Sequence, residues 1–167
     1  YTPTDVARHA AAAGGASADA FTVTVTDGHG GSVTVPVTVA IAPSNVVPAG
    51  AVNVSAADAA GRVAGTVTVT DGDADVVTYS ASTPGKGSVT VAPDGTFTYT
   101  PTDSARHAAA ADGASGSALA DAFTITVSDG HGGTVDIPVT VAVTPSNAVP
   151  VGGVGVGSAD ADRKSVV

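Results

Sequence analysis

Hydrophobic and polar residues alternate along two stretches of the chain, and the same glycine-rich segment interrupts both. In the later stretch, Phe123, Ile125 and Val127 alternate with Thr and Ser, and alternation resumes after the segment DGHGG at 129–133. A period of two predicts a strand with one buried face. The Asp-Gly and Gly-Gly pairs supply the positive φ angles of a tight connection. Each stretch is therefore predicted to form a β-hairpin.

The hairpin sequence is an internal repeat. Residues 19–42 and 121–144 match closely, and the proline-flanked linker that follows the first copy, 42–48, returns at 144–150. Proline at both ends favours an extended, fairly stiff spacer. The repeat predicts three parts: the C-terminal half of a truncated repeat (1–45), a complete repeat (46–147) and the start of a next repeat (148–161).

Shorter alternating stretches predict five further strands in the complete repeat, at 51–55, 65–70, 76–81, 88–92 and 96–100. Together with the hairpin they give seven short strands separated by turn signals, which is typical of a two-sheet β-sandwich. The aromatic residues lie on predicted inward faces or at the start of the chain. We expect them to fill the core rather than to bind glycans: Tyr1, Phe21, Tyr79, Phe97, Tyr99 and Phe123.

One short helix is predicted, over 103–113, between the strand 96–100 and the hairpin. Asp103 or Ser104 can cap its start, alanines favour its interior, and Gly113 can end it. A helix of this length is marginal in water, so it is expected to pack against the sandwich.

Composition restricts the function. All 15 acidic residues are Asp, and the formal net charge of −9 argues against binding to nucleic acid or to anionic membranes. Cysteine is absent, which excludes disulfides and cysteine-based zinc sites. No apolar run is long enough to predict a membrane span. Short carboxylates suit turns and calcium loops.

The densest candidate site is Asp71-Gly-Asp-Ala-Asp75. Three carboxylates at alternate positions repel one another unless they converge on a cation, and hard oxygen ligands suit Ca²⁺. In a sandwich of this topology the loop of Asp71, Asp73 and Asp75 emerges at the same end as Asp129 and Asn45. The sequence thus predicts a low-affinity calcium site formed by these five residues. The alternative is a solvated acidic turn.

The histidines are predicted to be surface residues rather than ligands. His29 and His131 lie in the glycine-rich turns, and His9 and His107 lie in the alanine-rich segments. These two locations are at opposite ends of one repeat, so the side chains are not expected to converge. No arrangement of nucleophile and base can be proposed either, so the sequence predicts no enzyme.

Three motifs together resemble the bacterial cadherin-like and VCBS-type tandem repeats. They are the runs TVTDGDADVVTYS at 68–80, PDGTFTYTP at 93–101 and FTITVSDGHGG at 123–133, and the resemblance covers residues 1–161. It implies an Ig/cadherin-like seven-stranded sandwich. It also implies a bacterial surface or secreted protein whose repeats contact one another and are stiffened by calcium at their junctions.

By the cadherin pattern, Asp71 and Asp73 match the aspartates of the loop between the second and third strands, and Asp129 matches the aspartate of the hairpin. The chain lacks the glutamates of cadherin junctions, and its linker offers only Asn45, so one ion per junction is expected. The implied role is structural or adhesive. The alternatives are binding of a glycan or another cell-surface ligand, and a passive spacer for a catalytic domain elsewhere in the parent protein.

The last six residues, 162–167, break the composition of the repeats. They place Arg163 beside Lys164, and the match to the earlier repeat stops immediately before them. Read as codons, they agree with the start of a common sequencing adapter. We expect them to be a sequencing artefact.

Overall fold

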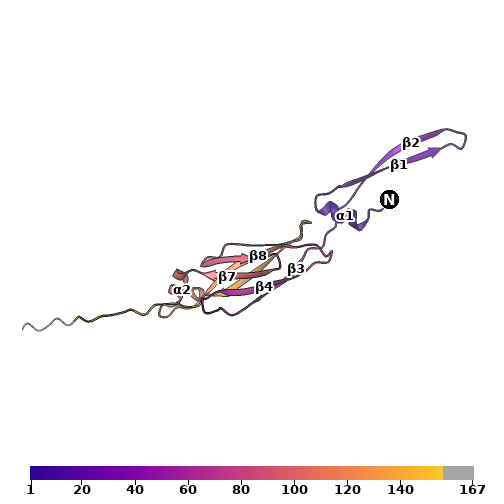
Figure 1. The fold of residues 1–167 in the computed structure, drawn as a ribbon. Coiled ribbons are helices and arrows are strands. Elements are labelled where there is room, and N and C mark those ends of the chain that lie inside the picture. Colours follow the sequence, from indigo (N-terminus) through magenta and orange to yellow (C-terminus); the bar gives the residue numbers. More distant parts are fainter. Residues whose placement is uncertain (156–167) are drawn as a thin grey trace, which may run out of the picture.

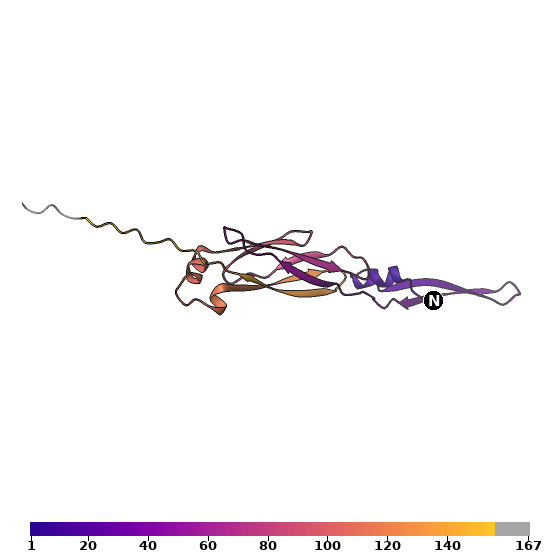
Figure 2. The same cartoon turned by 90° about the horizontal axis from the view of Figure 1, so that it is seen from below.

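The computed structural model of the chain describes residues 1–155. Figures 1 and 2 show an elongated molecule in which a hairpin segment, a β-sandwich and an extended C-terminal stretch follow one another. We call residues 1–40 the hairpin segment, 49–142 the sandwich and 41–48 the linker. The residues with a predicted adapter origin, 162–167, lie outside the described residues.

The sandwich contains seven strands in two sheets. The order in one sheet is β3-β4-β7-β6 and in the other β5-β8-β9, with every neighbouring pair antiparallel. This arrangement confirms the predicted all-β sandwich. The strands are β3 (Ala49–Val54), β4 (Val63–Thr70), β5 (Thr78–Ala81), β6 (Gly87–Val91), β7 (Thr96–Pro101), β8 (Ala120–Ser128) and β9 (Thr134–Ala142).

Alternation along the strands builds the core between the sheets. In β8 the inward side chains Phe123, Ile125 and Val127 are buried, and they pack with Phe97 and Tyr99 of β7 from the other sheet. The ring of Phe123 meets Phe97 edge-on, with centroids 5.8 Å apart, and stacks on Tyr99 at 6.1 Å. One predicted strand is shorter than expected: β5 begins at Thr78, and Val76 is 88% exposed.

The predicted helix is present and is shorter than predicted. Helix α2 spans Asp103–Ala109 and is capped by Thr102, whose hydroxyl accepts a hydrogen bond from the amide of Ala105 at 3.1 Å. The expected caps, Asp103 and Ser104, are wrong, because the chain already turns helical at Asp103. A short 3₁₀ turn, η1 (Gly116–Leu119), leads into β8.

The hairpin segment has the same local structure without a facing sheet. It contains α1 (Asp5–Ala12), β1 (Ala18–Thr26) and β2 (Ser32–Ala40), and Phe21 pairs with Val37 as Phe123 pairs with Val139. Phe21 is nevertheless 40% exposed and Tyr1 is 59% exposed. The prediction that these two rings fill a core is therefore wrong for the described chain, since no second sheet covers β1 and β2 within residues 1–155.

Candidate cation site between the hairpin segment and the sandwich

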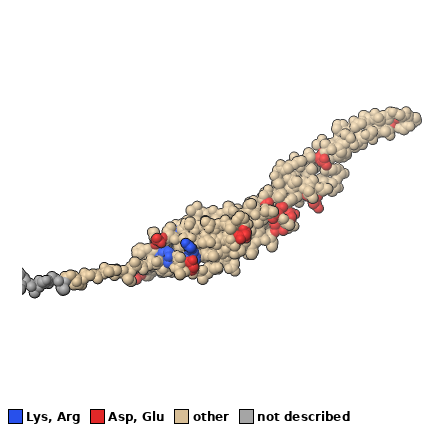
Figure 3. Space-filling model, in the orientation of Figure 1, with Lys and Arg blue, Asp and Glu red and all other residues tan. Residues whose placement is uncertain are grey.

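Carboxylates gather where the hairpin segment meets the sandwich. Figure 3 shows this cluster of acidic side chains, and on the same face the basic side chains lie at the opposite end of the sandwich. Three stretches meet there: the connection after β4, the turn between β8 and β9, and the linker. We call this region the junction.

The connection after β4 is organised around Asp71. Its Oδ1 accepts hydrogen bonds from the backbone amides of Asp73 at 3.0 Å and Asp75 at 3.1 Å, so the chain curls around this carboxylate. Ala74 completes the turn with φ of 61°, a left-handed conformation that costs a non-glycine residue about 1–2 kcal/mol.

The β8–β9 turn is organised around Asp129, which is 2% exposed. Its Oδ1 accepts hydrogen bonds from the amides of His131 at 2.8 Å and Gly133 at 2.9 Å. A side chain at position 133 would collide with this carboxylate, so the turn requires glycine there. Asp27 makes the same two bonds in the hairpin segment, with His29 and Gly31, which shows that the DGHGG sequence itself determines the turn.

The linker reaches both turns. The side-chain amide of Asn45 donates to Asp129 Oδ2 at 2.7 Å, and the backbone amide of Val46 donates to Asp73 Oδ2 at 2.7 Å. Helix α1 fixes the linker in turn, because Arg8 Nε donates to the carbonyl of Ala42 at 3.2 Å and the Arg8 carbonyl accepts from Ser44 at 3.1 Å. The linker therefore positions α1 against the sandwich.

These contacts create a cluster of oxygen atoms suited to a hard cation. Carboxylate oxygens of Asp71, Asp75 and Asp129 lie within 4.8 Å of one another. Asp71 Oδ2 and Asn45 Oδ1 are buried without a hydrogen bond, and Asp75 Oδ2 is buried with only a ring nitrogen of His131 nearby, at 3.2 Å. Buried oxygens without donors are unfavourable, and this donor set fits the oxygen preference of Ca²⁺.

The hydrogen bonds at the junction favour the ionised form of Asp129. Burial acts to raise the pKa of Asp129, but hydrogen bonds from Asn45 and from the amides of His131 and Gly133 outweigh it and hold the pKa below the ordinary value. Asp129 is therefore an anion at neutral pH. A cation beside it would also reduce the repulsion between this carboxylate and those of Asp71 and Asp75.

Of the five residues expected to form the site, Asp71, Asp75 and Asp129 converge and Asn45 lies against Asp129. Asp73 is not part of this group, and its Oδ2 accepts the hydrogen bond from the Val46 amide instead. Asp94, in the turn between β6 and β7, bonds only to Thr96 and stays apart from the cluster.

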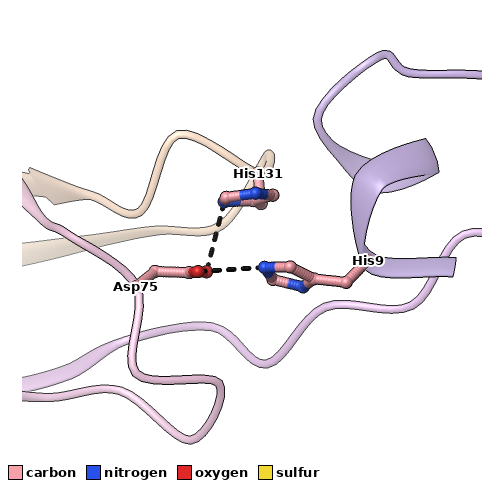
Figure 4. A group of neighbouring side chains, drawn as sticks. All are labelled: His9, Asp75 and His131. Carbon is pink, nitrogen blue, oxygen red and sulfur yellow. Dashed lines mark hydrogen bonds and ion pairs between the residues drawn. The ribbon is translucent and has the colours of Figure 1, made fainter. Parts of the chain in front are cut away.

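Two histidines that were predicted to be surface residues contribute to the junction. Figure 4 shows His9 and His131 on opposite sides of the junction, both directed toward Asp75. The prediction that the histidines do not converge is wrong for His9 and His131, because α1 faces the β8–β9 turn of the sandwich across the junction. Comparing the end of one repeat with the beginning of the following one would have found the pair.

Comparison with known proteins supports the architecture. The model of the bacterial cadherin-like domain family matches residues 45–145, which include all seven strands of the sandwich. A search of curated proteins and a search of solved structures each gave no significant match. Among the described residues, no helix is long and apolar enough to cross a membrane. With its two-sheet sandwich and this family match over most of its length, the chain belongs to the bacterial cadherin-like domain family.

Proposed function

We propose that the chain is a structural or adhesive module of a large bacterial surface or secreted protein, in which calcium stiffens the joints between successive repeats. In this proposal residues 1–45 are the C-terminal half of one repeat, 46–147 a complete repeat and 148–161 the start of the next. The observation that carries the proposal is the set of buried oxygens at the junction. They come from loops far apart in sequence and lack hydrogen-bond donors.

The two ends of the sandwich support a serial arrangement. At the far end, Arg106 of α2 repeats the contacts of Arg8: its Nε donates to Thr144 at 3.2 Å and its carbonyl accepts from Ser146 at 3.1 Å. His107 and Asn147, the counterparts of His9 and Asn45, are exposed there, whereas His9 and Asn45 are half-buried at the junction. The far end thus presents the surface that a following repeat would cover.

The mechanism is mechanical. Asp71, Asp75 and Asp129 belong to the sandwich, and Asn45 belongs to the linker. Bound Ca²⁺ would supply the positive charge that these oxygens lack. The ion would reduce the repulsion between the carboxylates of Asp71, Asp75 and Asp129. Asn45 and Val46 would then keep their hydrogen bonds to Asp129 and Asp73, and these bonds restrict bending at the linker. The partners of the module are neighbouring repeats, with a cell-surface protein or glycan as the adhesion target.

Calcium is expected to stabilise the intact chain against heat. A site with Kd on the order of 10⁻⁴ M, in the range of extracellular calcium modules, adds about 1–2 kcal/mol at 2 mM Ca²⁺. For a domain of this size that is a rise in Tm of roughly 5–10 °C. Thermal unfolding followed by circular dichroism, with calcium and then with chelator, measures the difference.

Asp71→Asn should abolish the calcium response. Asp94→Asn is the matched control, because Asp94 lies in a turn of the sandwich and outside the oxygen cluster, so its response to calcium should equal that of the wild type. An identical Tm with calcium and with chelator in the wild-type chain would reduce the cluster to an acidic turn.

A further inference from the structure

Two imidazoles from the two sides of the junction meet at one carboxylate (Figure 4). His9 projects from α1, and His131 projects from the β8–β9 turn. His9 Nε2 lies 2.9 Å from Asp75 Oδ1, and His131 Nδ1 lies 3.2 Å from Asp75 Oδ2. The rings stack with their centroids 3.9 Å apart. The side chain of Asp75 is 9% exposed, while both histidine side chains remain 26% exposed and open to a solute.

This donor set differs in kind from the oxygen cluster. Two ring nitrogens and one carboxylate oxygen lie within 4.8 Å of one another. Zinc binds imidazole and carboxylate at about 2.0–2.2 Å in a tetrahedron, which puts neighbouring ligand atoms roughly 3.3 Å apart. The two nitrogen–oxygen separations, 2.9 and 3.2 Å, run to different oxygens of Asp75, and His131 Nδ1 also lies 3.1 Å from the Asp129 carbonyl, so the His131 ring must turn for a nitrogen to face the ion. Calcium prefers oxygen ligands, whereas imidazole favours borderline metals such as zinc.

The surroundings of His9 also fit a metal-binding role. Its Nδ1 is buried without a hydrogen bond and lies 3.6 Å from Asp73 Oδ2. If Nε2 binds a metal, Nδ1 carries the proton and faces this carboxylate, the arrangement that commonly orients metal-binding histidines. A metal ion binds the lone pair of an imidazole nitrogen, and this lone pair lies in the plane of the ring. Because the two rings are stacked, zinc binding requires their side chains to rotate so that the rings move apart.

We propose that His9, Asp75 and His131 form a zinc site that joins the hairpin segment to the sandwich. The ligands come from α1, the connection after β4 and the β8–β9 turn, so the site exists only while the junction is closed. A fourth position is left for water, as in other zinc sites with three protein ligands. The site shares Asp75 with the oxygen cluster and adds a second class of cation to the proposed calcium-stiffened joint.

Isothermal titration of the intact chain with Zn²⁺ at pH 7.5 tests the site. The hydrogen bond to Asp75 raises the pKa of His9, so the pH must be high enough to free its nitrogen from the proton. We expect one Zn²⁺ per chain, bound at least about tenfold more weakly after His9→Ala or His131→Ala. Co²⁺ in place of Zn²⁺ should give the visible absorption of a four-coordinate nitrogen–oxygen site.

The chain supplies its own controls. His107→Ala and His29→Ala change the counterparts of His9 and His131, which do not face each other across the junction, so zinc affinity should be unchanged. Unchanged affinity in His9→Ala, or an equal loss in His107→Ala, would overturn the proposal. Both junction histidines are half-buried, and Tm in chelator verifies that the variants fold.

Calcium titrations of the same variants separate this proposal from the proposed function. His9→Ala should keep the calcium-dependent rise in Tm, because its side chain is outside the oxygen cluster. Asp75→Asn should lose both responses, since Asp75 belongs to both donor sets. Zinc binding without a calcium-dependent rise in Tm would refute only the proposed calcium site. A calcium-dependent rise in Tm without zinc binding that depends on His9 and His131 would refute only the zinc site.

Discussion

Phe123→Ala is expected to lower the free energy of unfolding of the sandwich by about 3–5 kcal/mol, the usual cost of deleting a buried aromatic ring. Phe123 is 5% exposed and packs between Phe97 and Tyr99, which belong to the opposite sheet. Its removal leaves a cavity that two paired sheets cannot close. Urea unfolding followed by tyrosine fluorescence measures the loss, since the chain contains no tryptophan.

Phe21→Ala is the matched control. Phe21 occupies the same position in the same hairpin sequence, but it is 40% exposed because no sheet faces β1 and β2 in the described chain. We expect a smaller loss than for Phe123→Ala, because 40% of Phe21 already contacts water and its truncation opens no closed cavity between sheets. Equal losses for Phe21→Ala and Phe123→Ala would mean that the hairpin segment is covered in solution.

Asp121→Asn should be the second most damaging of these changes, at about 2–3 kcal/mol. The carboxylate is buried and accepts four hydrogen bonds: from the Tyr99 hydroxyl at 2.9 Å and from the amides of Gly85, Lys86 and Ala122 at 3.2, 2.7 and 2.9 Å. An asparagine amide would direct its N–H₂ group at some of these donors. Asp19→Asn should be nearly neutral, because this carboxylate is exposed and accepts only two hydrogen bonds, from the Tyr1 hydroxyl and the Ala20 amide, each at 2.8 Å.

The same carboxylate predicts a loss of stability in acid. Burial acts to raise the pKa of Asp121, but the hydrogen bonds from Lys86, Tyr99, Ala122 and Gly85 lower it below its ordinary value. A lowered pKa in the folded state gives stability that is complete above the unfolded value, about 3.9, and is lost as the pH falls through the folded value. The wild type should therefore lose more stability than Asp121→Asn below about pH 4; parallel curves would contradict this.

The sandwich could be predicted from the sequence because the information is local. Alternation fixed the inward positions, as at Phe97 and Ile125, and the DGHGG turn folds identically at Asp27 and Asp129. The exposure of Phe21 could not be predicted from its own hairpin, since burial depends on a sheet supplied by another part of a repeat.

The junction was only partly predictable for related reasons. Sandwich topology brings Asp71, Asp75 and Asp129 to one end, and this could be reasoned from strand order. Asp73 instead accepts a hydrogen bond from the backbone amide of Val46, a contact with the linker that no pattern of side chains predicts. The meeting of His9 and His131 depends on how α1 is held by the linker, and no pattern within one repeat encodes it.

In the proposed function, a cation at the oxygen cluster restricts bending between the hairpin segment and the sandwich. Because the chain lacks cysteine, Ser17→Cys and Ser88→Cys provide two exposed spin-label positions, one on each side of the junction. Pulsed electron–electron double resonance then gives the distribution of distances between the two spin labels. We predict a narrow distribution in millimolar calcium, a broad one in chelator, and a broad one in both for Asp71→Asn. Equal widths with calcium and with chelator in the wild-type background would contradict a calcium-stiffened joint.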